Sequence, residues 1–179
     1  GATLWTIFFG ILWGIGGLTF GLSMRYLGIA LGQSIALGTC AGLGTILTPL
    51  FTGRPGDLTM PVIAGVAVTL AGIAVIGYAG SLKSATLSEE EKKESVKDFH
   101  FTRGIMVALS AGFMSACFSI GLGFGESLCF TQTADIYKTL PATLMVTLGG
   151  FVTNATYCFY QHAKNRTWSD YGQTGLYVN

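Results

Sequence analysis

Three side chains that lie within long apolar runs have the chemistry to hold a polar solute. The amides of Gln33 and Asn154 each donate and accept hydrogen bonds, and the indole of Trp13 can stack on the apolar face of a ring. An unpaired amide in an apolar environment is costly, so Gln33 is expected to face the interior of the protein. For Asn154, binding a solute and joining two helices remain equally open, and the Trp13 ring could also serve core packing. Together these residues form the predicted substrate-binding group for a molecule rich in hydroxyls.

The elements that carry these residues are five apolar runs of about 20 to 24 residues each. They cover about 4–24, 28–51, 61–82, 104–125 and 140–160, and none contains Asp, Glu, Lys or Arg. A helix of about 20 residues spans the hydrocarbon core of a bilayer. The runs therefore predict an all-α, polytopic transmembrane helix bundle.

Overall composition supports a membrane protein. Hydrophobic residues make up 50% of the 179-residue chain, charged residues only 11%, and mean hydropathy is +0.56. Soluble domains carry roughly 25% charged residues. The 26 glycines favour close helix packing in lipid. Three membrane helices are thus predicted within 1–82, a charged linker at 83–103, two membrane helices within 104–162, and a tail at 163–179.

Positive charges predict the orientation of these helices. Eight Lys and Arg residues fall on one side of the predicted bundle and two on the other, Arg54 and Lys138. By the positive-inside rule, the linker 83–103 and the tail lie in the cytoplasm. The chain opens close to an apolar run without an initiator Met, and we expect it to be an internal part of a longer protein.

Buried amides in a membrane bundle favour a secondary transporter for a small polar solute over a structural scaffold. No H-E-x-x-H, G-x-S-x-G or P-loop motif is present, so an integral membrane enzyme is disfavoured. The four cysteines do not show the paired spacing that is typical of a metal site. The sequence therefore predicts no bound metal and no other cofactor. A net charge of +1 gives no indication of nucleic-acid binding. The lipid bilayer is the expected partner, and the oligomeric state stays open.

Proton coupling would need an acid, and Glu126 at the outer end of the fourth run is the best candidate. No carboxylate or His lies deep in the five runs, although relays usually place one there. Either Glu126 carries the proton, or coupling resides outside this chain, or transport is uncoupled.

Particular motifs resemble the L-rhamnose–proton symporter family of the drug/metabolite transporter superfamily. The strongest are Leu12-Trp13-Gly14-Ile15-Gly16 and Phe20-Gly21-Leu22-Ser23-Met24-Arg25-Tyr26-Leu27-Gly28. Supporting matches occur at Leu47-Thr48-Pro49, Gly112-Phe113-Met114-Ser115-Ala116 and Gly149-Gly150 with Asn154.

The resemblance implies ten membrane helices in two inverted five-helix repeats, of which this chain would supply the third to seventh. It also implies proton-coupled uptake of L-rhamnose, or a related sugar, across the bacterial inner membrane. The chain departs from the family pattern at Gly17, Gly123 and Glu126, where enterobacterial members carry Asn, Asn and Lys. A transporter of another small solute in the same superfamily, or a non-transport membrane protein, is the alternative.

Overall fold

The computed structural model describes residues 1–86, 100–131 and 134–172, and these form helices joined by short connections. The long helices are α1 (Ala2–Leu27), α2 (Ile29–Phe51), α3 (Met60–Thr86), α5 (Phe101–Phe124) and α6 (Leu140–Asn165). The short helices are η1 (Pro55–Asp57), η2 (Gly125–Leu128), η3 (Asp135–Tyr137) and η4 (Thr167–Gly172). Each long helix overlaps one of the five apolar runs. The all-α, polytopic membrane bundle expected from the sequence is confirmed.

Among the described residues, four helices are long and apolar enough to cross a membrane: α1, α2, α3 up to Gly80, and α5 with η2. The 26-residue α6 has the necessary length, but it is less apolar than the other four. Its threonines and Asn154 dilute the apolar residues. A fifth span at α6 therefore stays a prediction.

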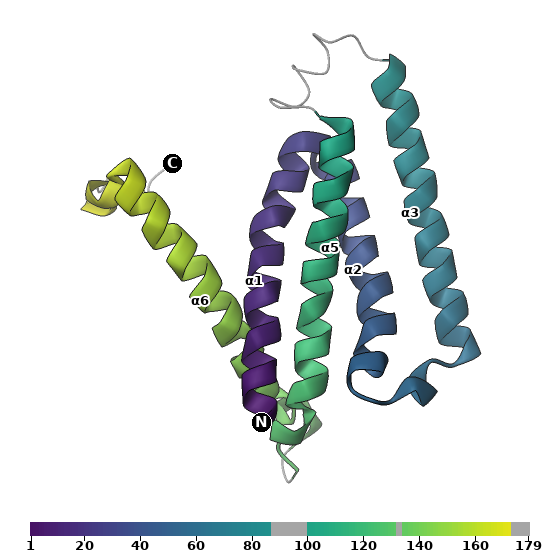
Figure 1. Ribbon diagram of the computed structural model, residues 1–179, viewed down its shortest axis with the longest axis vertical. Helices are drawn as coiled ribbons and strands as arrows, with labels where there is room; N and C mark the ends of the chain where they lie inside the picture. Colours follow the sequence, from purple (N-terminus) through teal and green to yellow (C-terminus); the bar gives the residue numbers. More distant parts are fainter. Residues whose placement is uncertain (87–99, 132–133, 173–179) are drawn as a thin grey trace.

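The centre of the molecule is formed by α1, α2 and α5, with α5 in extensive contact with both other helices (Figure 1). On one side α3 packs against α2, and on the other α6 packs against α1. Small residues permit the close contacts, because a side chain at Gly112 would collide with Ala36 and Thr39 of α2. Ala36, Ala108 and Ala111 are consequently almost wholly buried.

A single residue, Gly28, connects α1 to α2. Its backbone has φ 81° and ψ 164°, a conformation that residues with a Cβ rarely adopt. The Gly28 N–H donates to Met24 O at 2.8 Å, and Gly28 O accepts from the Gly32 N–H at 3.0 Å. Gly28 thus ends one helix and starts the next, and the chain reverses within a single step.

The helices extend into the segments predicted as linker and tail. The last turn of α3 includes Lys83, and α5 begins before Arg103, so the linker between helices is shorter than the predicted 83–103. Its charged central part, 87–99, lies outside the described residues. After α6, Arg166 adopts a left-handed conformation (φ 55°) and η4 follows, while 173–179 again lie outside the described part.

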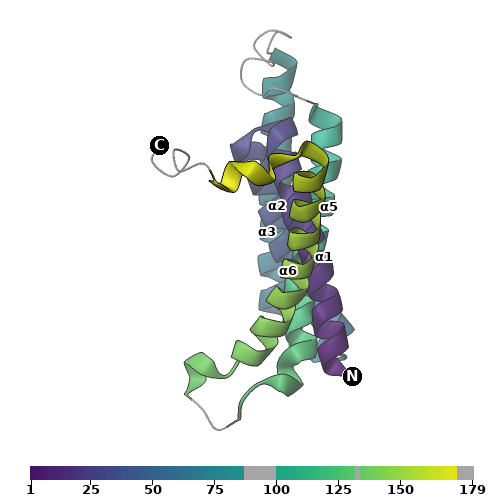
Figure 2. The ribbon, with the colours of Figure 1, turned by 90° about the vertical axis from the view of Figure 1, so that its left-hand side faces the viewer.

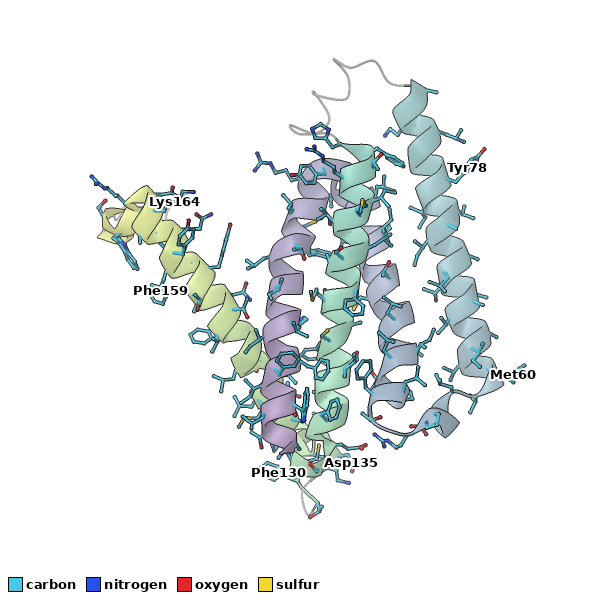
Figure 3. The ribbon with its side chains drawn as sticks, in the orientation of Figure 1. Met60, Tyr78, Phe130, Asp135, Phe159 and Lys164 are labelled. Atoms are coloured by element: carbon cyan, nitrogen blue, oxygen red, sulfur yellow. The ribbon has the colours of Figure 1, made fainter. Side chains whose placement is uncertain are left out.

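The two ends of the bundle differ in charge. Lys164 lies toward the end at which α1 finishes, whereas Asp135 and Phe130 lie at the opposite end (Figure 3). The short elements η2 and η3 carry Glu126 and Asp135 at that opposite end. The view turned by 90° shows the long helices running roughly along one common direction (Figure 2).

Candidate functional site: the cleft between α1 and α6

Helices α1 and α6 cross in close contact near the end of the molecule that carries the N-terminus. A Cβ added to Gly10 would lie 2.1 Å from Val146 O, and one added to Gly149 would lie 2.3 Å from Ile7 O. Only glycine allows the two backbones to approach in this way. Beyond this crossing α6 leans away from α1, so the two helices diverge toward their C-terminal ends (Figure 1).

A cleft of about 520 Å³ lies between the diverging helices, and we call it the α1–α6 cleft. Its lining residues are Ile11 and Leu18 of α1 together with Val152, Thr153, Thr156, Tyr157 and Tyr160 of α6. The volume falls within the range of small-molecule sites, which is roughly 300–1,000 Å³. The exposed lining is almost entirely carbon, as expected where aromatic faces and aliphatic chains form the walls.

The polar groups of the cleft are partly engaged within the protein. Thr153 Oγ1 donates to Ile11 O at 3.1 Å and so links α6 to α1. Thr156 Oγ1 donates to Val152 O of its own helix at 2.7 Å. The Tyr157 hydroxyl accepts a hydrogen bond from Gln161 Nε2 at 2.8 Å, which leaves its own proton to donate. The cleft therefore presents aromatic faces and aliphatic carbon rather than charged or polar groups.

Two of the three predicted binding residues meet at Gly150 of α6, and neither is among the residues that line the cleft. The Trp13 ring lies against Phe118, with centroids 4.9 Å apart, and it covers the position where Gly150 would carry a side chain. Asn154 Nδ2 donates to Gly150 O at 2.8 Å. Trp13 and Asn154 thus both contact Gly150. The structure shows Asn154 bonded within its own helix, a possibility that the sequence interpretation left out.

Gln33 is not brought together with the other two. Its side chain is exposed in the described part of the chain, so the expectation that it faces the interior of the protein stays a prediction. The buried face of α2 consists of Gly32, Ile35, Ala36, Thr39, Gly42 and Gly44, and Gln33 lies beside that face rather than on it. The neighbouring Gly32 packs on Ser23 and Met24, far along α1 from Trp13.

Glu126, the predicted proton carrier, forms an ion pair at the opposite end of the molecule from the cleft mouth. Arg54 Nη2 lies 2.6 Å from Glu126 Oε2, and Arg54 Nη1 donates to Oε1 at 3.2 Å. The two side chains remain 47% and 60% exposed. A second acid, Asp57, lies 4.0 Å from Arg54 Nε. The pair joins the connection after α2 to η2, which follows α5.

Sequence reasoning did not select the tyrosines of the cleft. Thr153, Thr156, Tyr157 and Tyr160 follow one another at spacings of three, one and three along α6. This spacing places them on one side of a helix, which is the signal that could have identified them. It was obscured because Thr and Tyr are also common where helices pack.

Comparison with known proteins gives a consistent relationship. Residues 1–173 match the family described as L-rhamnose-proton symport protein (RhaT). The chain is similar to the L-rhamnose-proton symporters of Yersinia pestis bv. Antiqua (strain Antiqua) and Yersinia pseudotuberculosis serotype O:3 (strain YPIII). Each is 33% identical over 180 residues, which cover 94% of this chain and 50% of the relative. The chain thus spans about half the length of the curated relatives it matches. No solved structure matches it.

Proposed function

The chain belongs to the L-rhamnose–proton symport protein family, and from this premise we propose that the protein containing it imports L-rhamnose or a related sugar together with protons. The family is one of transporters and not of enzymes. The observation that carries the proposal is a cleft of small-molecule size between two long helices. The chain that forms this cleft matches the family over residues 1–173.

In this proposal, the sugar binds along the α1–α6 cleft. Sugar rings present apolar C–H faces, and the cleft offers the aromatic rings of Tyr157 and Tyr160 for these faces to lie against. Trp13 and Asn154 lie beside it around Gly150 and remain candidates for binding. Gln33 would contribute only if the solute path also follows the exposed side of α2.

We place the protein in the bacterial inner membrane, with the segment 83–103 in the cytoplasm. In the structure Lys83, Arg103 and Lys164 belong to the last turn of α3, the start of α5 and the last turn of α6, which lie at one end of the bundle (Figure 1). Basic residues concentrate on the cytoplasmic side of membrane proteins. Helices α1 and α6 diverge toward this same end (Figure 1). Alternating access then means that the solute leaves toward the cytoplasm in the conformation described here.

Uptake of labelled sugar by intact cells tests this function. The full-length protein is produced in bacteria that lack their own rhamnose carrier, and accumulation of labelled L-rhamnose is followed with and without a protonophore. We expect accumulation that collapses when the proton gradient is removed. Uptake of another sugar but not of L-rhamnose would assign that sugar as the substrate. Accumulation that survives the protonophore would reject coupling to protons. Absence of uptake of any sugar would reject the proposal as a whole.

The same assay separates the candidate binding residues. Asn154→Leu and Tyr157→Phe should each lower uptake at limiting sugar concentration, because each removes polar groups at or beside the cleft. Thr45→Val is the matched control, since the Thr45 hydroxyl donates to Ala41 O within α2 and lies apart from the cleft. Uptake by the two variants equal to that of the control would show that these groups only support packing.

A further inference from the structure

Four glycines form one continuous groove along α1, which we call the glycine groove: Gly10, Gly14, Gly17 and Gly21. At 3.6 residues per turn they fall within about 60° of one another around the helix axis. The first two are covered by α6, since a Cβ at Gly10 would strike Val146 O and one at Gly14 would lie 2.7 Å from Thr153 Cβ.

The described part of the chain leaves the second half of the glycine groove uncovered. A Cβ added to Gly17 or to Gly21 would meet nothing within 4 Å, and both residues are exposed. Leu18, which lies between them in sequence, lines the α1–α6 cleft. The uncovered half of the groove therefore lies on the same turns of α1 as one wall of the cleft, about 60° from Leu18 around the helix axis at Gly21.

The face of α6 that covers Gly10 and Gly14 also continues beyond the crossing. It begins with Val146 and Gly149, passes through Thr153, and continues to Tyr157 and Tyr160 at helical spacing. The two tyrosines line the cleft and are 44% and 59% exposed. Two complementary surfaces, glycines on α1 and tyrosines on α6, thus extend past one established contact and are separated only by the divergence of the helices.

We propose that the cleft closes when α6 swings about the glycine crossing and packs Tyr157 and Tyr160 against Gly17 and Gly21. This inference rests on the proposed function, because a transporter that works by alternating access must close the side described here as open. The closed contact continues the existing one, and glycine leaves room for an aromatic ring to lie directly on a helix backbone. The hydrogen bond from Thr153 to Ile11 lies close to the pivot and can persist in both conformations.

Disulfide trapping in the full-length protein tests the closure. All native cysteines are replaced, Leu18→Cys and Thr156→Cys are introduced on the two walls of the cleft, and membranes are oxidised without sugar. A disulfide needs Cα atoms within about 7 Å, so its rate reports how often α6 approaches α1. Adding Gly17→Leu and Gly21→Leu should slow cross-linking at least about tenfold, the factor given by 1.4 kcal/mol of overpacking in the closed state.

Gly65→Leu with Gly72→Leu provides the matched control. These α3 glycines also have nothing within 4 Å, so the control should leave the cross-linking rate unchanged. Absence of a cross-link in the parent protein, or an equal rate in the Gly17/Gly21 and control variants, would overturn the proposal. If the double variant is not produced at the parent level, Gly21→Leu alone replaces it. Failure of that variant to fold as well would mean that another helix fills the groove, and would also overturn it.

Because cross-linking is measured without sugar, its outcome is independent of which solute is carried. A protein that cross-links as expected yet fails to accumulate L-rhamnose would retain the closure and lose the proposed substrate. If the protein accumulates L-rhamnose but the Gly17 and Gly21 substitutions leave the cross-linking rate unchanged, the proposed function stands and the proposed closure is rejected.

Discussion

At the scale of single residues, the pair formed by Arg54 and Glu126 joins two connections that are distant in sequence. It is exposed, and exposed ion pairs contribute at most about 1 kcal/mol to stability. Glu126 can therefore exchange its partner without unfolding the protein. None of the five long helices contains Asp or Glu, so Glu126 is the carboxylate for which we propose proton coupling.

Replacing that carboxylate separates coupling from transport. Glu126→Gln keeps the shape of the side chain but cannot carry a proton, so we expect the sugar to equilibrate across the membrane without accumulating. Asp135→Asn is the control, because Asp135 pairs with nearby Lys138, at 2.6 Å, within its own connection. Labelled-sugar accumulation under an imposed proton gradient is the measurement. Undiminished accumulation by the Glu126→Gln protein would show that Glu126 is not the proton carrier.

Thr153 offers a second test at this scale, since its hydroxyl bonds to the neighbouring helix. Thr153→Val should lower the free energy of unfolding by about 0.5–1 kcal/mol, in line with hydrogen bonds between membrane helices. Thr156→Val serves for comparison, because the Thr156 hydroxyl donates to Val152 O within α6. Unfolding of the full-length protein in detergent gives both values. Equal losses in the two variants would show that the bond between helices contributes nothing of its own.

At the scale of elements, the crossing of α1 and α6 requires that the residues at the contact have no side chain, which only glycine provides. Gly149→Ala should destabilise the protein by about 1–3 kcal/mol, because the new methyl group would lie against the backbone at Ile7. Gly72→Ala on α3 meets open space and should be neutral or slightly stabilising through better helix propensity. Thermal unfolding in detergent compares the two. Similar melting temperatures would mean that α6 shifts at little cost.

The helices could be predicted from the sequence and the cleft could not, for a physical reason. Length and hydropathy are properties of one segment, and they located all five long helices to within a few residues. The cleft results from the angle between α1 and α6, which depends on where glycines of two segments meet. Gln33 shows the same limit, because an amide on a helix does not reveal which side of that helix is covered.

At the scale of the whole molecule, the distribution of charge predicts which end faces the cytoplasm. In intact cells, a membrane-impermeant maleimide should label a cysteine introduced by Asp135→Cys but not one introduced by Lys164→Cys. Both residues lie in described segments near opposite ends of the bundle (Figure 3). Permeabilised cells should give labelling at both positions, which controls for accessibility. The reverse pattern in intact cells would invert the proposed topology.

The turn at Gly28 has a consequence for biosynthesis. Because one residue separates α1 from α2, no hydrophilic loop exists there for the insertion machinery to move across or hold back. The two helices must therefore partition into the lipid as a single hairpin. Any side chain larger than hydrogen at residue 28 would strain that hairpin during its formation, before the rest of the bundle has been synthesised to compensate.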